Sequence, residues 1–226
     1  MKVLIVMAHP DDEILGCGGT ISRMTNEGDK AYSFILGEGI TSRYDQREEA
    51  DKKEIEELHE RTIRAAKVIG ISQTIWQDLP DNMFDTIPFL KIVKSVESII
   101  QEISPDIIFT HHSGDLNIDH AVVARAVLTA SRPIKNTPVK ELYACEIPSS
   151  TDWSFQTIEP VWRPNVFFDI TRTIETKLQA LKEYETEMRP QPHPRSYENI
   201  SVIAQRWGSL IGTPAAEAFQ LIRSVR

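Results

Sequence analysis

The sequence predicts an α/β protein built on an open, mostly parallel sheet, and three features lead to this expectation. Short apolar runs rich in Val and Ile alternate with longer stretches whose apolar residues recur at helical spacing. The run at 3–8 is wholly apolar and the run at 106–110 has an apolar centre, which is typical of strands buried on both faces. Each of these runs ends in a loop of polar side chains, and such loops face each other at the carboxyl edge of an open sheet.

The length and composition fit one soluble domain over residues 1–226. A chain of 226 residues can bury a core of its own, and 41% hydrophobic and 26% charged residues are ordinary values for a globular protein. The net charge of -8 argues against a nucleic-acid-binding surface and against an anionic membrane partner. The expected partner is therefore a small molecule, and a locally basic site could still take an anionic one.

The N-terminal apolar stretch does not read as a signal peptide, because it is short, lacks a cleavage site and runs straight into charged residues. No other stretch is long enough to span a membrane, so we expect a cytoplasmic protein without stable membrane insertion. The two cysteines, Cys17 and Cys145, indicate neither a disulfide framework nor a zinc finger. Cys17 could be a nucleophile, but its helical neighbours favour a packing role.

In the first half of the chain, strands and helices are expected to alternate. The strand at 3–8 precedes a helix whose apolar positions start at Ile14 and which ends at 27–29. A second strand follows at 31–36, and a charged helix with an apolar stripe over 55–69 stops at Gly70. After a short strand at 75–76 and a turn-rich loop at 79–85, apolar spacing over 92–103 predicts a third helix.

The second half opens with the strand at 106–110, the polar loop 111–120 and a helix over 123–128. Strands at 142–147 and 166–170 and a helix over 174–188 are expected next. Three prolines within 189–195 rule out a helix there, 200–211 is expected to be helical, and 218–222 fits either a strand or a helix. We find no internal repeat and no low-complexity linker, which supports a single domain.

The first polar loop lies in the stretch VLIVMAHPDDEILGCGGT (3–20) and offers metal ligands. His9 and Asp12 could bind one ion, because an imidazole nitrogen combined with a carboxylate oxygen suits Zn²⁺. Asp11 lies between them and could stay free as a base. Two alternatives are that the acids only cap the next helix at its positive end and that His9 is an ordinary loop residue.

The second polar loop supplies a third ligand, His120. Two histidines and one carboxylate leave room for water and a substrate oxygen, which is the layout of a catalytic zinc site. Zinc lowers the pKa of bound water from about 15.7 towards about 7 and polarises a carbonyl group. Asp11 could take the proton of that water and later protonate a leaving amine, so the pattern predicts amide hydrolysis.

The two loops also carry a resemblance to a known family. AHPDDE (8–13), followed by GGT (18–20), resembles the signature of the PIG-L/LmbE-like deacetylases. HHSGDLNIDH (111–120) is similar to the second metal-binding loop of that family. The resemblance covers the order of elements over most of the chain and implies a Rossmann-like fold with helices on both faces of the sheet. Relatives often assemble, so a homo-oligomer is a further expectation.

The resemblance also implies roles for individual residues. It implies that His9, Asp12 and His120 bind Zn²⁺ as the cofactor and that Asp11 is the general base. Asp119, next to the last ligand, corresponds to an acid that helps set the electrostatics of the catalytic site.

Two departures from the family pattern bear on the site. Several members carry a histidine three residues before the last ligand, where this chain has Asn117. Asn can donate a hydrogen bond to an oxyanion but cannot act as an acid, and His112 could supply the missing function. Some members also place an arginine in the helix before the Ala-Ala pair. Arg43 and Arg61 are both near that position, as candidate substrate-binding residues, but neither is clearly in register.

The proline-rich loop RPQPHPR (189–195) carries three further candidates for substrate binding, Arg189, His193 and Arg195. A stiff basic loop on an acidic protein could bind a phosphate or carboxylate through bidentate arginine contacts. The alternative, which we favour slightly, is a surface crossover whose arginines pair with neighbouring acids.

The sequence therefore predicts a zinc-dependent hydrolase that removes the acetyl group from an N-acetylated amino sugar or its conjugate. Two rival hypotheses remain. The first is a non-haem Fe(II) enzyme, because two histidines and one carboxylate also form that triad. The second is a sugar- or nucleotide-binding module without activity, although binding alone does not need the free carboxylate of Asp11.

Overall fold

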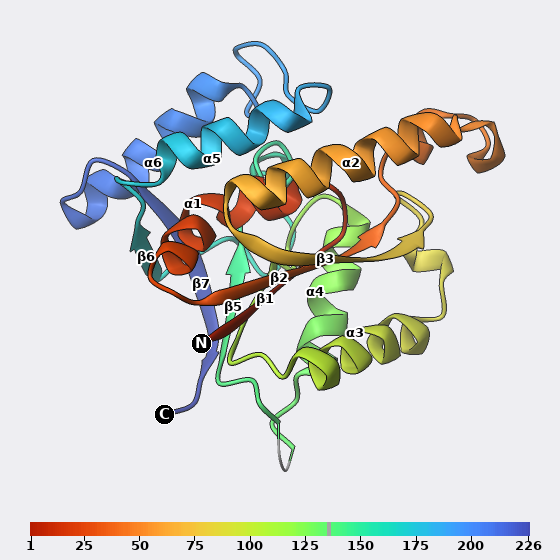
Figure 1. Cartoon of the computed structure of the whole chain (residues 1–226), viewed down its shortest axis with the longest axis horizontal. Helices are drawn as coiled ribbons and strands as arrows, with labels where there is room; N and C mark the ends of the chain where they lie inside the picture. Colours follow the sequence, from red (N-terminus) through yellow and green to blue (C-terminus); the bar gives the residue numbers. More distant parts are fainter. Residues whose placement is uncertain (135–136) are drawn as a thin grey trace.

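The computed structural model describes residues 1–134 and 137–226 and confirms the predicted class, a single α/β domain with helices on both faces of a mostly parallel sheet (Figure 1). In the described residues the strands are β1 (Lys2–Met7), β2 (Lys30–Gly37), β3 (Ile71–Leu79), β4 (Ile107–His111), β5 (Glu141–Cys145), β6 (Val166–Asp169) and β7 (Ala216–Ser224). The α-helices are α1 (Asp12–Asn26), α2 (Lys52–Val68), α3 (Phe89–Ile103), α4 (Ile118–Ala130), α5 (Ile174–Leu181) and α6 (Tyr197–Ile211).

The strand order determines where a ligand can bind. The strands lie in the order β3-β2-β1-β4-β5-β7-β6, with β7 antiparallel to both of its neighbours. The chain moves outward from β1 through β2 and β3 and then returns to place β4 on the other side of β1. At such a reversal the loops after the two central strands diverge and leave a crevice at their carboxyl ends. The two polar loops follow β1 and β4, so both lie at this crevice.

The core has two main layers because successive strand residues point to opposite faces. In β1, Val3, Ile5 and Met7 belong to a cluster with α1, α2 and α5, whereas Leu4 and Val6 belong to a cluster with α3 and α4. Figure 1 shows these two helix groups on opposite sides of the sheet. Cys17 is fully buried in the first cluster, which confirms its packing role.

Two elements differ markedly from their predicted extent, and a third segment, ambiguous in the sequence, is assigned by the structure. Strand β3 covers nine residues rather than two. It is an edge strand with several exposed polar side chains, so it lacks the apolar run that marks the central strands. The helix predicted to reach Met188 ends at Leu181, but Tyr184 stays buried in a 3₁₀ turn (Lys182–Tyr184), which explains the continued apolar spacing. The ambiguous 218–222 segment lies in strand β7.

No helix in residues 1–134 or 137–226 is long and apolar enough to cross a membrane.

Candidate metal centre and active site

A tight turn joins β1 to α1 and brings two acids to the crevice. Asp12 is the first residue of α1, and Asp11 before it has a φ of 103°, a left-handed value that is rare for a residue with a side chain. The Asp11 N–H donates to Glu13 Oε2 at 3.1 Å, and Tyr184 donates its hydroxyl proton to Glu13 Oε1 at 2.6 Å. These buried contacts stabilise the unusual turn, so the direction of the Asp11 side chain is fixed by its backbone.

The three predicted metal ligands converge. His9 Nδ1 lies 3.3 Å from His120 Nε2 and 3.4 Å from Asp12 Oδ2, and His120 Nε2 lies 3.3 Å from Asp12 Oδ2. Three ligand atoms at ~2.0–2.1 Å from a tetrahedral zinc ion are separated by roughly 3.3–3.4 Å. The buried Asp12 Oδ1 has no hydrogen-bond partner among the described residues. The spacing and the free carboxylate oxygen both fit a metal ion bound by this group.

Carboxylates lie behind both histidines and determine which ring nitrogen faces the centre. His9 Nε2 is 3.0 Å from Asp119 Oδ2 and 3.1 Å from Asp81 Oδ1. His120 Nδ1 is 3.3 Å from Asp115 Oδ1. A carboxylate that accepts the N–H of one ring nitrogen leaves the lone pair of the other nitrogen for a metal. Asp119 therefore acts on His9, although it is next to His120 in the sequence.

The acidic surroundings favour positive charge at the centre. Burial alone would lower the pKa of His9, but the carboxylates of Asp119 and Asp12 help to raise it well above its ordinary value. Burial also opposes the shift at His120, yet Asp12 and Asp115 raise the pKa of this imidazole to about 9. Burial would raise the pKa of Asp12, whereas His120 holds it well below its usual range. A divalent cation can supply the charge that this site favours.

One buried histidine of the site was missed in the sequence. His111, the last residue of β4, accepts the Ala8 N–H through Nε2 at 2.8 Å and stacks on His120 with ring centroids 3.9 Å apart. Burial lowers the pKa of His111 to about 3, so this ring is a neutral acceptor. The alternation of side-chain directions along β4 could have indicated that His111 faces the site. His111 points to the same face as Phe109, which is the face covered by α1, whereas His112 points to the other.

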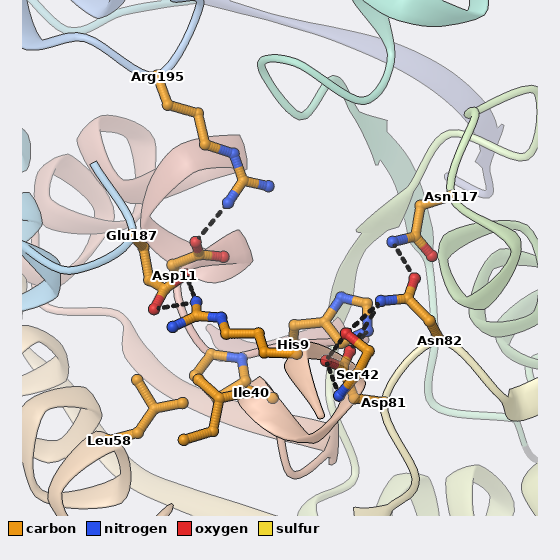
Figure 2. A pocket seen from close by; sticks show the side chains of 13 residues that line it. His9, Asp11, Ile40, Ser42, Leu58, Asp81, Asn82, Asn117, Glu187 and Arg195 are labelled. Carbon is orange, nitrogen blue, oxygen red and sulfur yellow. Dashed lines mark hydrogen bonds and ion pairs between the residues drawn. The ribbon is translucent and has the colours of Figure 1, made fainter. Parts of the chain in front are cut away.

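A cavity of about 180 Å³ opens over the centre (Figure 2). Asp11 lies in its wall, and Arg195 Nη1 donates to Asp11 Oδ2 at 2.8 Å. Burial raises the pKa of Asp11 well above its usual range, and the Arg195 guanidinium partly opposes this shift. Arg43 also lines the cavity and donates to Glu187 Oε1 at 2.7 Å. The site therefore combines a candidate metal-binding group with an adjacent carboxylate held by an arginine.

Asn117 occupies the opposite wall of the same cavity. It is the N-cap of α4, and its Oδ1 accepts the Asp119 N–H at 2.9 Å. Its Nδ2 donates to Asn82 Oδ1 at 2.9 Å. The structure thus places an amide donor at the position where the sequence resemblance implies a histidine in several family members.

Four other predicted site residues do not line this cavity in the described part of the chain: His112, Arg61, Arg189 and His193. His112 hydrogen-bonds through Nε2 to the carbonyl of Pro160 at 2.7 Å and lies edge-on to Trp162. Arg61 pairs with Glu57 one turn earlier on α2, since both project from the same side of the helix. Neither residue lines the cavity among the residues that the structure describes, and the roles predicted for His112 and Arg61 stay predictions.

Only Arg195 of the three proline-loop candidates reaches the cavity in the described residues. Arg189 is exposed and donates to backbone carbonyls of its own turn, and His193 packs edge-on against Trp153. Arg195 itself binds Asp11 rather than presenting a free bidentate face. The predicted role of this loop in phosphate or carboxylate recognition stays a prediction, whereas the alternative of an arginine paired with a neighbouring acid agrees with the Arg195–Asp11 contact.

Three further residues of the site were not predicted from the sequence. Asp115 belongs to the second motif and accepts from Thr151 Oγ1 at 2.8 Å and from the hydroxyl of Ser150. Asp81 and Asn82 come from the loop after β3, which the sequence identified only as turn-rich. The available signal was an acid that follows a strand at the same edge of the sheet.

Comparison with known proteins agrees with this geometry. The family PIG-L, described as GlcNAc-PI de-N-acetylase, matches residues 4–131, which is more than half of the chain. The match covers both polar loops and all three candidate metal ligands.

Individual relatives extend the likeness over more of the sequence. The diacetylchitobiose deacetylase of Thermococcus kodakarensis is 25% identical over 99% of this chain and 84% of its own length. An uncharacterized deacetylase of Escherichia coli, YaiS, is 29% identical over 81% of this chain and 90% of its own length.

A solved structure shows that the same fold also serves other chemistry. The 4-carboxy-2-hydroxymuconate hydratase GalB of Pseudomonas putida superposes with a TM-score of 0.78 at 19% identity, covering 100% of this chain and 97% of its own. The fold alone therefore does not define the reaction, and the residues of the site must do so.

Proposed function

Because the chain belongs to the PIG-L (GlcNAc-PI de-N-acetylase) family, we propose that it is a zinc-dependent hydrolase that removes the acetyl group from an N-acetylated amino sugar or its conjugate. The observation that carries this proposal is the triangle of His9, Asp12 and His120 ligand atoms with the carboxylate of Asp11 in the same cavity. The similarity to a diacetylchitobiose deacetylase supports the class of substrate.

The donor set fits zinc. His9 and His120 offer nitrogens, and Asp12 offers an oxygen, at spacings that match a tetrahedral ion. Bound Zn²⁺ supplies a Lewis acid that polarises the acetamide carbonyl and makes a nearby water more acidic. The hydrogen bond of His9 Nε2 with Asp119 orients the first imidazole, and the Asp115 carboxylate lies 3.3 Å from Nδ1 of the second, so the ligand atoms need little rearrangement on binding.

Asp11 performs the proton transfers. Its carboxylate takes a proton from the attacking water as the new carbon–oxygen bond forms. It then gives that proton to the amine nitrogen as the carbon–nitrogen bond breaks, which leaves acetate and a free amino sugar. Arg195 and the turn around Glu13 hold the carboxylate in place for both steps.

Asn117 stabilises the negative charge that develops on the acetyl oxygen. Its Nδ2–H is a neutral hydrogen-bond donor at the cavity wall, and such donors contribute about 10²–10³-fold to rate in acyl transfer. An amide cannot give up a proton at neutral pH, so it leaves the acid role to Asp11.

Acetate release from a panel of N-acetylated sugars, sugar nucleotides and thiol-linked glycosides tests the proposal. The zinc-loaded wild type should release acetate from at least one member, with or without oxygen. Asp11→Asn, which keeps the shape but cannot accept a proton, should keep its zinc and lose at least about 10³-fold in kcat.

The two rival functions predict other results. An Fe(II) enzyme would need oxygen for turnover, and a binding module would show affinity for a sugar without acetate release. Zinc loss in Asp11→Asn would make Asp11 a ligand and overturn its assigned role. The cytoplasmic location and the homo-oligomer stay predictions.

A further inference from the structure

Asn82 lines the candidate site, yet none of the sequence motifs contains it. Its backbone has a left-handed φ of 55°, and its N–H donates to Asp119 Oδ2 at 2.7 Å. Its side chain reaches Asn117 on one side and Ser42 on the other. Asn82 therefore contacts both the carboxylate behind the ligand His9 and the proposed oxyanion donor.

The Asp81 carboxylate, which can only accept, fixes the directions of the hydrogen bonds around Asn82. The Asp81 carboxylate only accepts, so the Ser42 hydroxyl donates to Asp81 Oδ2 at 2.6 Å. The Ser42 oxygen can then accept from Asn82 Nδ2 at 3.0 Å, and Asp81 Oδ1 accepts from the same Nδ2 at 3.3 Å. Asn82 Oδ1 must consequently face Asn117 and accept from its Nδ2.

The backbone N–H at the start of α4 gives the same orientation of the two amides, Asn82 and Asn117, independently. The Asp119 N–H can only donate, so Asn117 must turn its Oδ1 towards the start of α4. Its Nδ2 then faces Asn82 and the cavity. Of the two hydrogens on Nδ2, the contact with Asn82 uses one and leaves the second for a ligand. Figure 2 shows this amide pair across the cavity from Arg195 and Asp11.

We propose that Asn82 is a positioning residue, whose side-chain amide holds Asn117 with an N–H directed into the cavity. The proposal rests on the proposed function, in which Asn117 donates to the acetyl oxyanion. A histidine at this position could act through its ring, whereas the terminal torsion of a short amide is set by its hydrogen-bond partners. The N-cap bond from the Asp119 N–H holds Oδ1 of Asn117, and Nδ2 needs a second partner to fix its donor. In this chain Asn82 supplies that partner from a different loop.

Two variants test the role of Asn82, and a third provides the control. Asn82→Gly removes the side chain but keeps the left-handed backbone and its N–H bond to Asp119. Ser42→Ala removes the hydroxyl that orients Asn82. Asp78→Gly is the matched control, because Asp78 also has a left-handed φ, of 47°, and its exposed side chain does not line the cavity in the described residues.

The first readout is independent of activity. The side-chain amide signal of Asn117 in a ¹⁵N–¹H spectrum, assigned by its loss in Asn117→Asp, should move in Asn82→Gly and, less far, in Ser42→Ala. It should stay in place in Asp78→Gly. An unmoved Asn117 signal in Asn82→Gly would overturn the proposal, even if the protein released no acetate from any sugar.

The second readout is the division of the effect between kcat and KM. A misplaced donor acts on the transition state, so Asn82→Gly should lower kcat by about 10- to 100-fold and change KM by less than about twofold. Zinc content and Tm should match those of Asp78→Gly. An unchanged kcat, or a loss confined to KM, would overturn the role of Asn82 in positioning the donor.

Discussion

Arg195 and Asp11 are 184 residues apart in the sequence, yet their side chains form a 2.8 Å ion pair in the wall of the candidate active site. Arg195 Nε also donates to Ser149 Oγ at 3.0 Å and to the carbonyl of Pro148 at 3.2 Å. Three contacts made by one planar group fix the guanidinium, and the guanidinium in turn fixes the carboxylate.

Arg195→Met should therefore lower kcat by about 10- to 100-fold without loss of zinc, because Asp11 loses the partner that orients it. Arg195→Lys should recover only part of this loss, since an ammonium cannot reproduce the planar set of contacts. Steady-state kinetics with zinc analysis of the same samples checks this expectation. A wild-type rate in Arg195→Met would show that the turn around Asp11 is sufficient.

His111 should stabilise the candidate metal centre through its contacts with Ala8 and His120. His111→Phe keeps the ring stacked on His120 but removes the acceptor of the Ala8 N–H, which should cost about 1–3 kcal/mol of unfolding free energy. Zinc affinity should fall by about 10- to 100-fold, because the backbone next to the candidate ligand His9 loses the hydrogen bond that holds it. Chelator competition and urea unfolding measure the two effects. His112→Phe is the adjacent control, and equal zinc affinity in both variants would exclude a special role for His111.

A buried ion pair fixes helix α1, which begins with the candidate metal ligand Asp12. Lys177 Nζ lies 2.6 Å from Glu217 Oε1 and donates to the carbonyl of Leu15 at 2.8 Å. Glu217 accepts the backbone N–H groups of Gly19 and Thr20 at 3.0 and 2.7 Å. The pair therefore joins α5 and β7 to the middle of α1.

Lys177→Met should destabilise the protein by about 3–5 kcal/mol, because it leaves the Glu217 carboxylate buried without its counter-charge. The double variant Lys177→Met/Glu217→Gln should be more stable than the single one, since no lone charge remains and the Gln carbonyl can still accept from α1. Urea denaturation of the two variants measures this difference. A double variant less stable than Lys177→Met would contradict the explanation.

Glu146 should make stability depend on pH. Burial raises its pKa from 4.5 to about 7, and Trp207 Nε1 donates a hydrogen bond to its carboxylate. Between these two pH values the native state holds more protons than the unfolded state, so the stability contributed by Glu146 falls as pH rises and then levels off above about 7.

Glu146→Gln should consequently match the wild type at pH 5 and exceed it by about 1 kcal/mol at pH 8, a value reduced for the partial exposure of this side chain. Urea unfolding across this range checks the sign. A variant that is less stable than the wild type at pH 8 would show that the ionised carboxylate is favourable in the fold.

The parts of the molecule that follow from local sequence were predictable. The apolar run before His9 and the spacing of apolar residues after Asp12 define β1 and α1 without knowledge of the rest of the chain. The polar loops after β1 and β4 meet because both central strands end at the same edge. For this reason the three candidate metal ligands could be selected from the amino-acid sequence alone.

Other parts depend on packing between distant segments. Asn82 and Arg195 enter the site from loops that have no local signal for their direction. Lys177 and Glu217 resemble solvent-facing charges in the sequence, and only the packing of α5 and β7 against α1 buries them. Such contacts require the tertiary arrangement, which the order of strands and helices alone does not provide.

We propose above that the His9, Asp12 and His120 group holds the zinc that hydrolysis requires. Bound zinc and acetate release, measured on the same samples of wild type, His120→Ala and His112→Ala, test this assignment. We expect about one equivalent of zinc and acetate release in the wild type and in His112→Ala, and neither in His120→Ala. Full zinc content with acetate release in His120→Ala would contradict the claim and place the metal elsewhere.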